Sequence, residues 1–225
     1  WSLCGVALTE QKGTKHMAKL NENFFNLKKN YLFIDIGKRV KAYTAAHPEA
    51  KLIRMGIGDV TQPLAPVVVD AMVKASKEMG VKETFRGYED SGAGYDFLRE
   101  AVSNYYKSFG ADVDPAVIHI SDGAKSDCGN IIDIFGEGNT VVVTDPAYPV
   151  YVDSNIMSGN TVVYANSTEE NGFAAMPPKD VKADLIYLCS PNNPTGSVYT
   201  KAQLREWVDY ALANNAVIIL SLIHI

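Results

Sequence analysis

The sequence lacks the features of membrane, secreted and zinc-binding proteins. No apolar run approaches the roughly 20 residues that a membrane-spanning helix needs, and the first residues lack the basic-then-apolar order of a secretory signal. The three cysteines, Cys4, Cys128 and Cys189, are odd in number, widely spaced and outside any CxxC pair. We therefore expect a cytoplasmic protein with no disulfide framework, no metal site and no membrane contact.

An excess of basic residues is also missing. The chain of 225 residues has 21 Lys and Arg against 26 Asp and Glu, a net charge of -5. Nucleic acid binding requires a concentrated basic surface, so we expect no nucleic acid partner. Neither G-x-G-x-x-G nor a Walker A pattern is present, which disfavours a dinucleotide-binding or nucleotide-binding Rossmann domain. The remaining composition, 47% hydrophobic, is that of an ordinary globular protein.

Apolar spacing predicts an α/β fold. Helices are predicted over residues 33–46, 66–79, 97–109, 125–135, 148–158 and 201–214. Strands are predicted over residues 52–58, 117–121, 140–144, 161–164, 185–189 and 217–220. Strands and helices alternate after residue 115, which indicates a mostly parallel sheet with helices on both faces. Ligands of such sheets bind beyond the carboxyl ends of the strands, so the following loops are the candidate site.

Three loops follow predicted strands in this region. Residues 121–127 run from a strand into a helix. Their small side chains and free N–H groups suit an anion such as phosphate, and the alternative is ordinary capping of the helix by Ser121 or Asp122. Tyr148 lies between two prolines on a stiff turn, where its ring either stacks on a flat ligand or packs under the loop. Asn193 begins an Asn-Pro-Thr-Gly turn and either donates to a phenolate-like oxygen or has no function.

These three loops, in this order, resemble the fold type I, class I/II aminotransferases, in which Asn-Pro-Thr-Gly recurs. Residues 21–25, 31–33, 54–63 and 83–88 resemble LL-diaminopimelate aminotransferases in particular, and the resemblance covers residues 17–220. It implies an N-terminal arm and part of a small domain over residues 17–60. Part of the large domain, which binds pyridoxal phosphate, would follow over residues 61–220. Residues 1–16 then count as a foreign or upstream extension, and residues 221–225 as a terminus outside the family pattern.

The resemblance implies a role for several residues. Ala124 and Lys125 would meet the phosphate of pyridoxal 5'-phosphate, Tyr148 would stack on its ring, and Asn193 would donate to its O3' atom. Tyr88 would reach the phosphate of the partner subunit in a homodimer. The residues that would border a small amino-acid substrate are Tyr31, Gly58, Lys125, Tyr148 and Asn193. Without the resemblance, Tyr31 and Tyr88 would be interpreted as packing aromatics.

The sequence departs from the family pattern at two places. Many members have a glutamate three residues after the equivalent of Tyr88, whereas here Glu89 and Asp90 precede an insertion and are weak candidates for binding a distal amine. Leu222 stands where the aspartate that pairs with the pyridine nitrogen is expected. The Schiff-base lysine and the carboxylate-binding arginine are expected beyond residue 225. Lys125, in the phosphate loop, is not a substitute, so we expect this chain alone to be inactive.

The resemblance implies a transaminase of lysine biosynthesis, acting on LL-2,6-diaminopimelate or tetrahydrodipicolinate with glutamate or 2-oxoglutarate. The first alternative is another fold type I enzyme that acts on an amino acid, such as a different aminotransferase, a C–S lyase or a decarboxylase. The second alternative is a non-catalytic α/β module that binds phosphate.

Overall fold

The computed structural model describes residues 19–28, 32–53, 55 and 62–222. The chain divides into two compact units. We call the first, Trp1–Lys28 with Asp127–Ile225, the sheet unit, and the second, Lys29–Ser126, the helical unit. The predicted domain division at residue 60 stays a prediction. Every helix among the described residues is too short or too polar to cross a lipid bilayer.

The described residues of the sheet unit form four strands that all run parallel. They are β1 (Thr140–Asp145), β2 (Thr161–Asn166), β3 (Leu185–Cys189) and β4 (Val217–Ser221). Their order across the sheet is β2-β1-β3-β4, with each neighbouring pair in parallel register. Every residue of β3 is buried, as expected for a central strand covered on both faces. The predicted parallel sheet is therefore confirmed.

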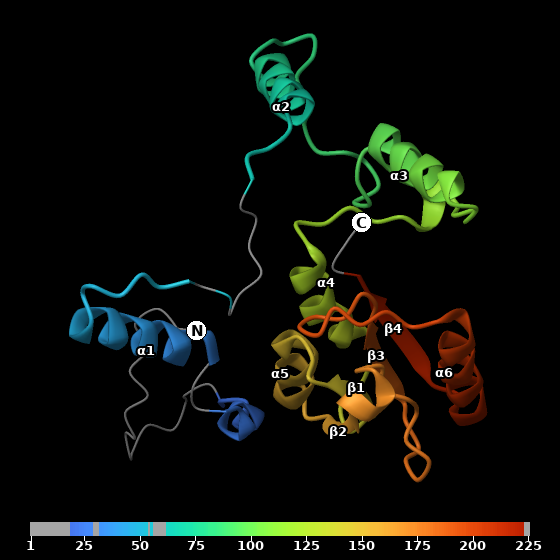
Figure 1. Cartoon of the computed structure of the whole chain (residues 1–225). Helices are drawn as coiled ribbons and strands as arrows, with labels where there is room; N and C mark the ends of the chain where they lie inside the picture. The colour runs from blue at the N-terminus through green and yellow to red at the C-terminus, as the bar shows by residue number, and fades with distance from the viewer. Residues whose placement is uncertain (1–18, 29–31, 54, 56–61, 223–225) are drawn as a thin grey trace. The chain divides into compact units, whose positions relative to one another are not determined.

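Helices cover both faces of this sheet, as predicted (Figure 1). Successive side chains of a strand point to opposite faces, so β1 and β3 contribute to two separate apolar clusters. Val142 and Ile186 pack with Trp207 of α6 (Lys201–Asn214) on one face. Tyr187 packs with Tyr151 of α5 (Pro149–Met157) on the other. Burying these side chains supplies the main stabilisation of the unit.

Local sequence explains where α5 and α6 begin and end. Pro149 occupies the first turn of α5, where its missing N–H costs nothing. Thr200 and Gln203 form a reciprocal capping box at the start of α6, with the Gln203 N–H donating to Thr200 Oγ1 at 3.2 Å. Asn215 adopts a left-handed conformation with φ of 55° and ends α6.

The part of the helical unit that the structure describes has three longer helices. They are α1 (Leu32–Ala46), α2 (Pro66–Met79) and α3 (Asp96–Ser108). The short helix α4 (Ala124–Asn130) begins in this unit and ends in the sheet unit. Among the described residues, the 3-10 helix η2 (Pro115–Val117) lies in this unit, and η1 (Glu22–Asn26), η3 (Ile131–Ile134) and η4 (Glu169–Asn171) lie in the sheet unit. Apart from the three segments below, the predicted helices and strands agree with the structure to within two residues at each end.

Three predicted elements were wrong in whole or in part. Residues 117–121 form no strand, because no described strand pairs with them: among the described residues, one backbone hydrogen bond reaches them from outside the local turn, from Ile120 N to Ala93 O at 2.8 Å. Residues 51–53 and 55 are irregular, and the rest of the strand predicted over residues 52–58 lies outside the described residues. The helix predicted over residues 125–135 is an α-helix only as far as Asn130. Its last turn, Ile131–Ile134, is a 3-10 helix, whose backbone hydrogen bonds join residues three apart instead of four.

Candidate functional site

The candidate site lies where the sheet changes its direction of winding. β1 is followed by α5 on one face, and β3 is followed by α6 on the other. These two strands are direct neighbours and run parallel. Such a position is a topological switch point, where ligands of α/β proteins bind beyond the carboxyl ends of the strands. The loops after Asp145 and after Cys189 both leave the sheet here.

Tyr148 is held by aromatic contacts at this edge. It is the residue before α5 and has extended backbone, and its side chain is half-buried. Its ring meets that of Tyr151 edge-on, with centroids 6.0 Å apart, and Tyr151 stacks on Tyr187 at 5.3 Å. Burial raises the pKa of the Tyr151 hydroxyl, although a hydrogen bond with Ser221 opposes this. This neutral aromatic support orients the Tyr148 ring and leaves its hydroxyl without a hydrogen bond to the described residues.

Asn193 lies on a turn that its neighbours close. The Asn192 N–H donates to Ser197 O at 2.8 Å, and the Gly196 N–H donates to Asn192 O at 2.8 Å. Gly196 has φ of 73°, a conformation that glycine adopts without steric cost. The Asn193 side chain is half-buried and makes no hydrogen bond with the described residues. The turn therefore presents an uncommitted amide beside the strand end.

Asn192 joins this turn to the loop of Tyr148. Its Nδ2 atom donates to Pro146 O at 3.3 Å and to Thr195 Oγ1 at 2.9 Å. Only 4% of the residue is exposed, and its Oδ1 atom is buried without a hydrogen-bond partner among the described residues. An unsatisfied buried acceptor lowers the stability of the folded state by about 1–3 kcal/mol. Asn192 therefore makes its two donated hydrogen bonds although its buried oxygen destabilises the fold.

Two groups on these neighbouring loops have the chemistry to bind a flat aromatic ligand that carries a phenolic oxygen. Tyr148 offers a supported ring for stacking, and Asn193 offers a free N–H donor on the neighbouring loop. The sheet unit thus brings together two of the residues that sequence analysis singled out. Asn192 was missed, because its place beside Asn193 in the motif does not tell which of the two amides is buried.

The helical unit carries the predicted phosphate loop. Ala124 and Lys125, the first residues of α4, are both exposed. The preceding Gly123 has φ of 141° and open space where a Cβ would lie, while its N–H donates to Ser121 Oγ at 3.2 Å. This glycine lets the backbone turn sharply into the helix, and a ligand can approach it closely.

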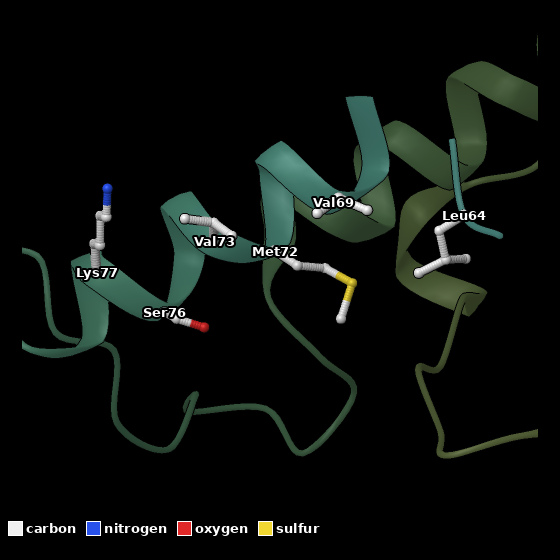
Figure 2. Close-up of a pocket in the computed structure, with 6 residues that line it drawn as sticks. All are labelled: Leu64, Val69, Met72, Val73, Ser76 and Lys77. Atoms are coloured by element: carbon white, nitrogen blue, oxygen red, sulfur yellow. The ribbon is translucent and has the colours of Figure 1, made fainter. Parts of the chain in front are cut away.

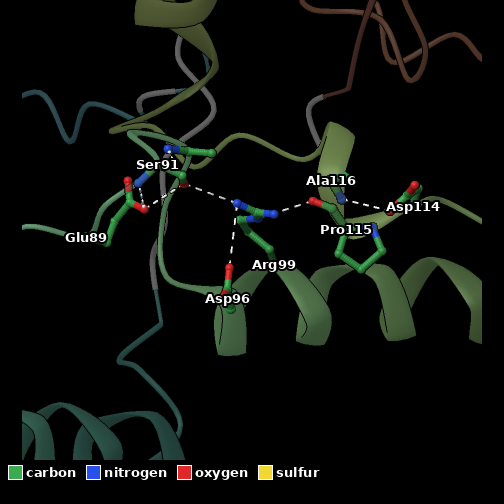
Figure 3. Close-up of polar contacts among 8 residues, drawn as sticks. Glu89, Ser91, Asp96, Arg99, Asp114, Pro115 and Ala116 are labelled. Carbon is green, nitrogen blue, oxygen red and sulfur yellow. Dashed lines mark hydrogen bonds and ion pairs between the residues drawn. The ribbon is translucent and has the colours of Figure 1, made fainter.

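Tyr88 belongs to the same unit and is fully exposed. The turn that follows it is held by a polar network, shown in Figure 3. Glu89 Oε2 accepts from Ser91 N at 2.8 Å and from Ser91 Oγ at 2.7 Å, and these bonds hold the pKa of Glu89 below its usual range. Glu89 is thus engaged in its own turn, while Asp90 beside it is exposed.

Arg99 anchors this turn to α3. Its Nη1 atom donates to Ser91 Oγ at 3.3 Å and lies 3.7 Å from Asp96 Oδ1. Its Nε atom donates to Pro115 O at 3.2 Å (Figure 3). One guanidinium therefore links the turn after Tyr88 to the segment that leads toward the phosphate loop. The sequence pattern gave no signal for this role.

Gly94 makes a second link between the same two segments. It has φ of 106°, and a Cβ at this position would lie 2.6 Å from Ile120 Cγ1. The neighbouring Ala93 O accepts the hydrogen bond from Ile120 N. The Gly-Ala-Gly sequence at residues 92–94 was the available signal for this close approach, which fixes the Tyr88 turn against the residues just before Ser121.

Other predicted or visible features lie apart from these loops. Tyr31 and Gly58, the remaining predicted substrate residues, lie outside the described residues. Figure 2 shows a shallow apolar hollow along α2. Its lining residues are Leu64, Val69, Met72, Val73, Ser76 and Lys77. It contains none of the predicted site residues, and most of its side chains are exposed apolar groups with no catalytic chemistry.

Comparison with known proteins gives concordant matches. Residues 50–225 match the family of class I and II aminotransferases. The LL-diaminopimelate aminotransferase of Parabacteroides distasonis is 52% identical, over 90% of this chain and 52% of its own length. The solved L,L-diaminopimelate aminotransferase from Chlamydomonas reinhardtii is 37% identical with a TM-score of 0.80, over 92% of this chain and 53% of its own. The chain thus spans about half the length of these relatives.

More distant structures share the fold. A single mutant of the Thermus thermophilus aspartate aminotransferase is 22% identical with a TM-score of 0.76, over 92% of this chain and 54% of its own. At that identity the likeness concerns the fold alone. The architecture is accordingly that of the fold type I aminotransferases, as predicted, and proteins of this kind generally use pyridoxal phosphate.

Proposed function

The chain belongs to the class I and II aminotransferase family, and from this premise we propose that the whole protein is an LL-diaminopimelate aminotransferase that uses pyridoxal 5'-phosphate. It would transfer the amino group of glutamate to tetrahydrodipicolinate, with uptake of one water, and release 2-oxoglutarate and LL-2,6-diaminopimelate. The reaction belongs to lysine biosynthesis. The whole protein would act in the cytoplasm as a homodimer.

One observation carries the proposal. Tyr148 and Asn193 occupy neighbouring loops at the switch point, in a chain that is 52% identical to a relative named for this activity. The placement of Tyr148 and Asn193 supports a binding site for the ring of the cofactor. The 52% sequence identity to this relative supports the choice of substrate.

The cofactor, when bound, supplies an electron sink for the α-carbon chemistry. The side chains of this chain would bind and orient it. Tyr148 would lie against the ring, and the Asn193 amide would donate to O3'. The N–H of Ala124 and the Lys125 side chain would hold the phosphate, and Tyr88 would contribute a hydroxyl to the phosphate of the partner subunit.

The substrate would lie on the open side of the same loops. Lys125, Tyr148 and Asn193 would border it together with Tyr31 and Gly58. Glu89 is a weaker candidate for binding the substrate than a free carboxylate would be, because Ser91 already donates two hydrogen bonds to one of its oxygens.

The test is an amino-transfer assay on the whole protein. The protein is incubated with pyridoxal phosphate, glutamate and excess tetrahydrodipicolinate, and 2-oxoglutarate and LL-diaminopimelate are quantified. Equal amounts of the two products are expected. Asn193→Ala should abolish most of the turnover, whereas Asn214→Asp, a change in α6, should retain it. Absence of 2-oxoglutarate from the unchanged protein would refute the substrate assignment.

The alternatives within the fold give different products. A C–S lyase would release a thiol or sulfide from a sulfur amino acid, and a decarboxylase would release carbon dioxide. Both are assayed on the same preparation. A non-catalytic phosphate-binding module would bind the cofactor phosphate and form none of these products.

A further inference from the structure

Asn192 differs from its neighbour Asn193 in burial and in bonding. Asn193 is half-buried with an uncommitted amide, whereas Asn192 is 4% exposed and donates twice through Nδ2. The orientation of the Asn192 amide is set by its partners, because Pro146 O can only accept and therefore requires the nitrogen on its side.

The turn around Asn193 is thereby fastened at two distant points of the chain. Asn192 ties it to Pro146, in the loop after β1. At the other end, Ser197 Oγ donates to Phe173 O at 2.7 Å. Thr195 Oγ1 lies between them, 2.9 Å from Asn192 Nδ2 and 2.9 Å from Ser197 Oγ. A continuous polar chain therefore crosses the turn, and the turn cannot shift without breaking it.

Simple core filling does not explain an asparagine at this position. The buried Oδ1 accepts no hydrogen bond from the described residues, so an apolar side chain of similar size would avoid an unsatisfied group. What the amide provides is a link between the loop that carries Tyr148 and the turn that carries Asn193.

We propose that Asn192 is a positioning residue for the cofactor ring, whose hydrogen bond to Pro146 sets the spacing between the Tyr148 ring and the Asn193 amide. The inference rests on the proposed function, since both groups act on the same flat ring. Asn192 itself touches no reacting atom and acts through Asn193 and Tyr148.

The experiment uses pyridoxamine phosphate as the probe, because its binding needs no Schiff base. Asn192→Asp keeps the shape of the side chain and replaces the donor that faces Pro146 by oxygen. We expect about tenfold weaker affinity for pyridoxamine phosphate, the loss that follows from a broken hydrogen bond to a buried group. Affinity for inorganic phosphate should be unchanged, because the phosphate loop is untouched.

A spectroscopic signature separates positioning from general destabilisation. The absorbance of bound pyridoxamine phosphate is followed against pH to find where its 3'-hydroxyl ionises. Asn192→Asp should move this pH in the same direction as Asn193→Ala. The matched control is Asn214→Asp, since Asn214 is also partly buried and donates to a backbone carbonyl, Tyr210 O, at 2.8 Å. It should change neither affinity nor absorbance.

The outcomes discriminate between the two proposals. If Asn193→Ala weakens binding while Asn192→Asp leaves affinity and absorbance as in the unchanged protein, the role of Asn192 is refuted and the proposed function stands. If the unchanged protein does not bind pyridoxamine phosphate, both fall. If Asn192→Asp does not fold, Asn192→Ser, which is too short to reach Pro146, replaces it under the same expectations.

Discussion

The side-chain amide of Asn192 lies 3.3 Å from the carbonyl oxygen of Pro146, although 46 residues separate them. This bond spans the point where two neighbouring parallel strands end and their loops diverge to opposite faces of the sheet. The two side chains proposed to hold the cofactor ring, Tyr148 and Asn193, lie on the two segments that it joins.

Removing the ring of Tyr148 should weaken cofactor binding. Tyr148→Ala is expected to reduce pyridoxamine phosphate affinity about tenfold, because stacked aromatic pairs contribute about 0.5–1.5 kcal/mol beyond the area they bury. Tyr148→Phe keeps the ring and its edge-on contact with Tyr151, so its affinity should stay close to that of the unchanged protein. Absorbance titration measures both. Equal losses in the two variants would mean that the hydroxyl, and not the ring, makes the contact.

A side chain at Gly94 should disturb the link between the Tyr88 turn and the phosphate loop. Gly94→Ala introduces a Cβ 2.6 Å from Ile120 Cγ1 at φ of 106°. We expect a loss of about 1–3 kcal/mol in the free energy of unfolding, from backbone strain and displacement of Ile120. Urea denaturation measures the stability, and titration with inorganic phosphate measures the effect on the loop.

Gly92→Ala is the matched control for Gly94. Gly92 also has a positive φ, 70°, but has open space around the added Cβ. It should show the cost of backbone strain alone, about 1–2 kcal/mol, and leave phosphate affinity unchanged. If both variants lose the same stability and the same affinity, the contact with Ile120 does not couple the two loops.

Lys125 should bind the phosphate of the cofactor without reacting with its aldehyde. Treatment of the 225-residue chain with pyridoxal phosphate and then borohydride should add no cofactor mass to the peptide that contains Lys125. Lys125→Gln should weaken inorganic phosphate binding, because a charge-assisted hydrogen bond is lost. Peptide mass spectrometry and phosphate titration measure the two effects. A stoichiometric adduct at Lys125 would contradict its proposed role.

Tyr199 should make the sheet unit sensitive to alkaline pH. Its hydroxyl donates to Ala175 O at 2.9 Å, and burial raises the pKa of Tyr199 to about 12. The pKa of tyrosine in an unfolded chain is about 10. The neutral form is therefore favoured by folding. Its contribution to stability is complete below pH about 10 and is lost as the pH rises toward 12.

The variant that tests this is Tyr199→Phe. With this change the urea midpoint should decrease less steeply between pH about 10 and 12, because position 199 then carries no phenol that can ionise. Tyr105→Phe, a change at an exposed tyrosine of α3, serves as the control and should keep the slope of the unchanged protein. An unaltered slope in Tyr199→Phe would show that other groups govern alkaline unfolding.

Local patterns predicted most elements because their causes are local. Residues 140–144 and 185–189 are apolar runs of strand length, and both form strands with residues from distant parts of the chain. Residues 117–121 have a similar pattern and form none, because a strand exists only where a second strand pairs with its backbone. No local sequence pattern reports whether such a partner is present.

The sequence by itself determined the alternation of strands and helices, the loop positions of Tyr148 and Asn193, and the family resemblance. These follow from side-chain periodicity, turn residues and short motifs, all of which are properties of neighbouring residues. Only the tertiary structure decided that Asn192 bonds to Pro146, that Gly94 lies against Ile120, and that Glu89 closes its own turn. The first two depend on packing between segments distant in the chain, and the third on which of several possible partners a side chain reaches.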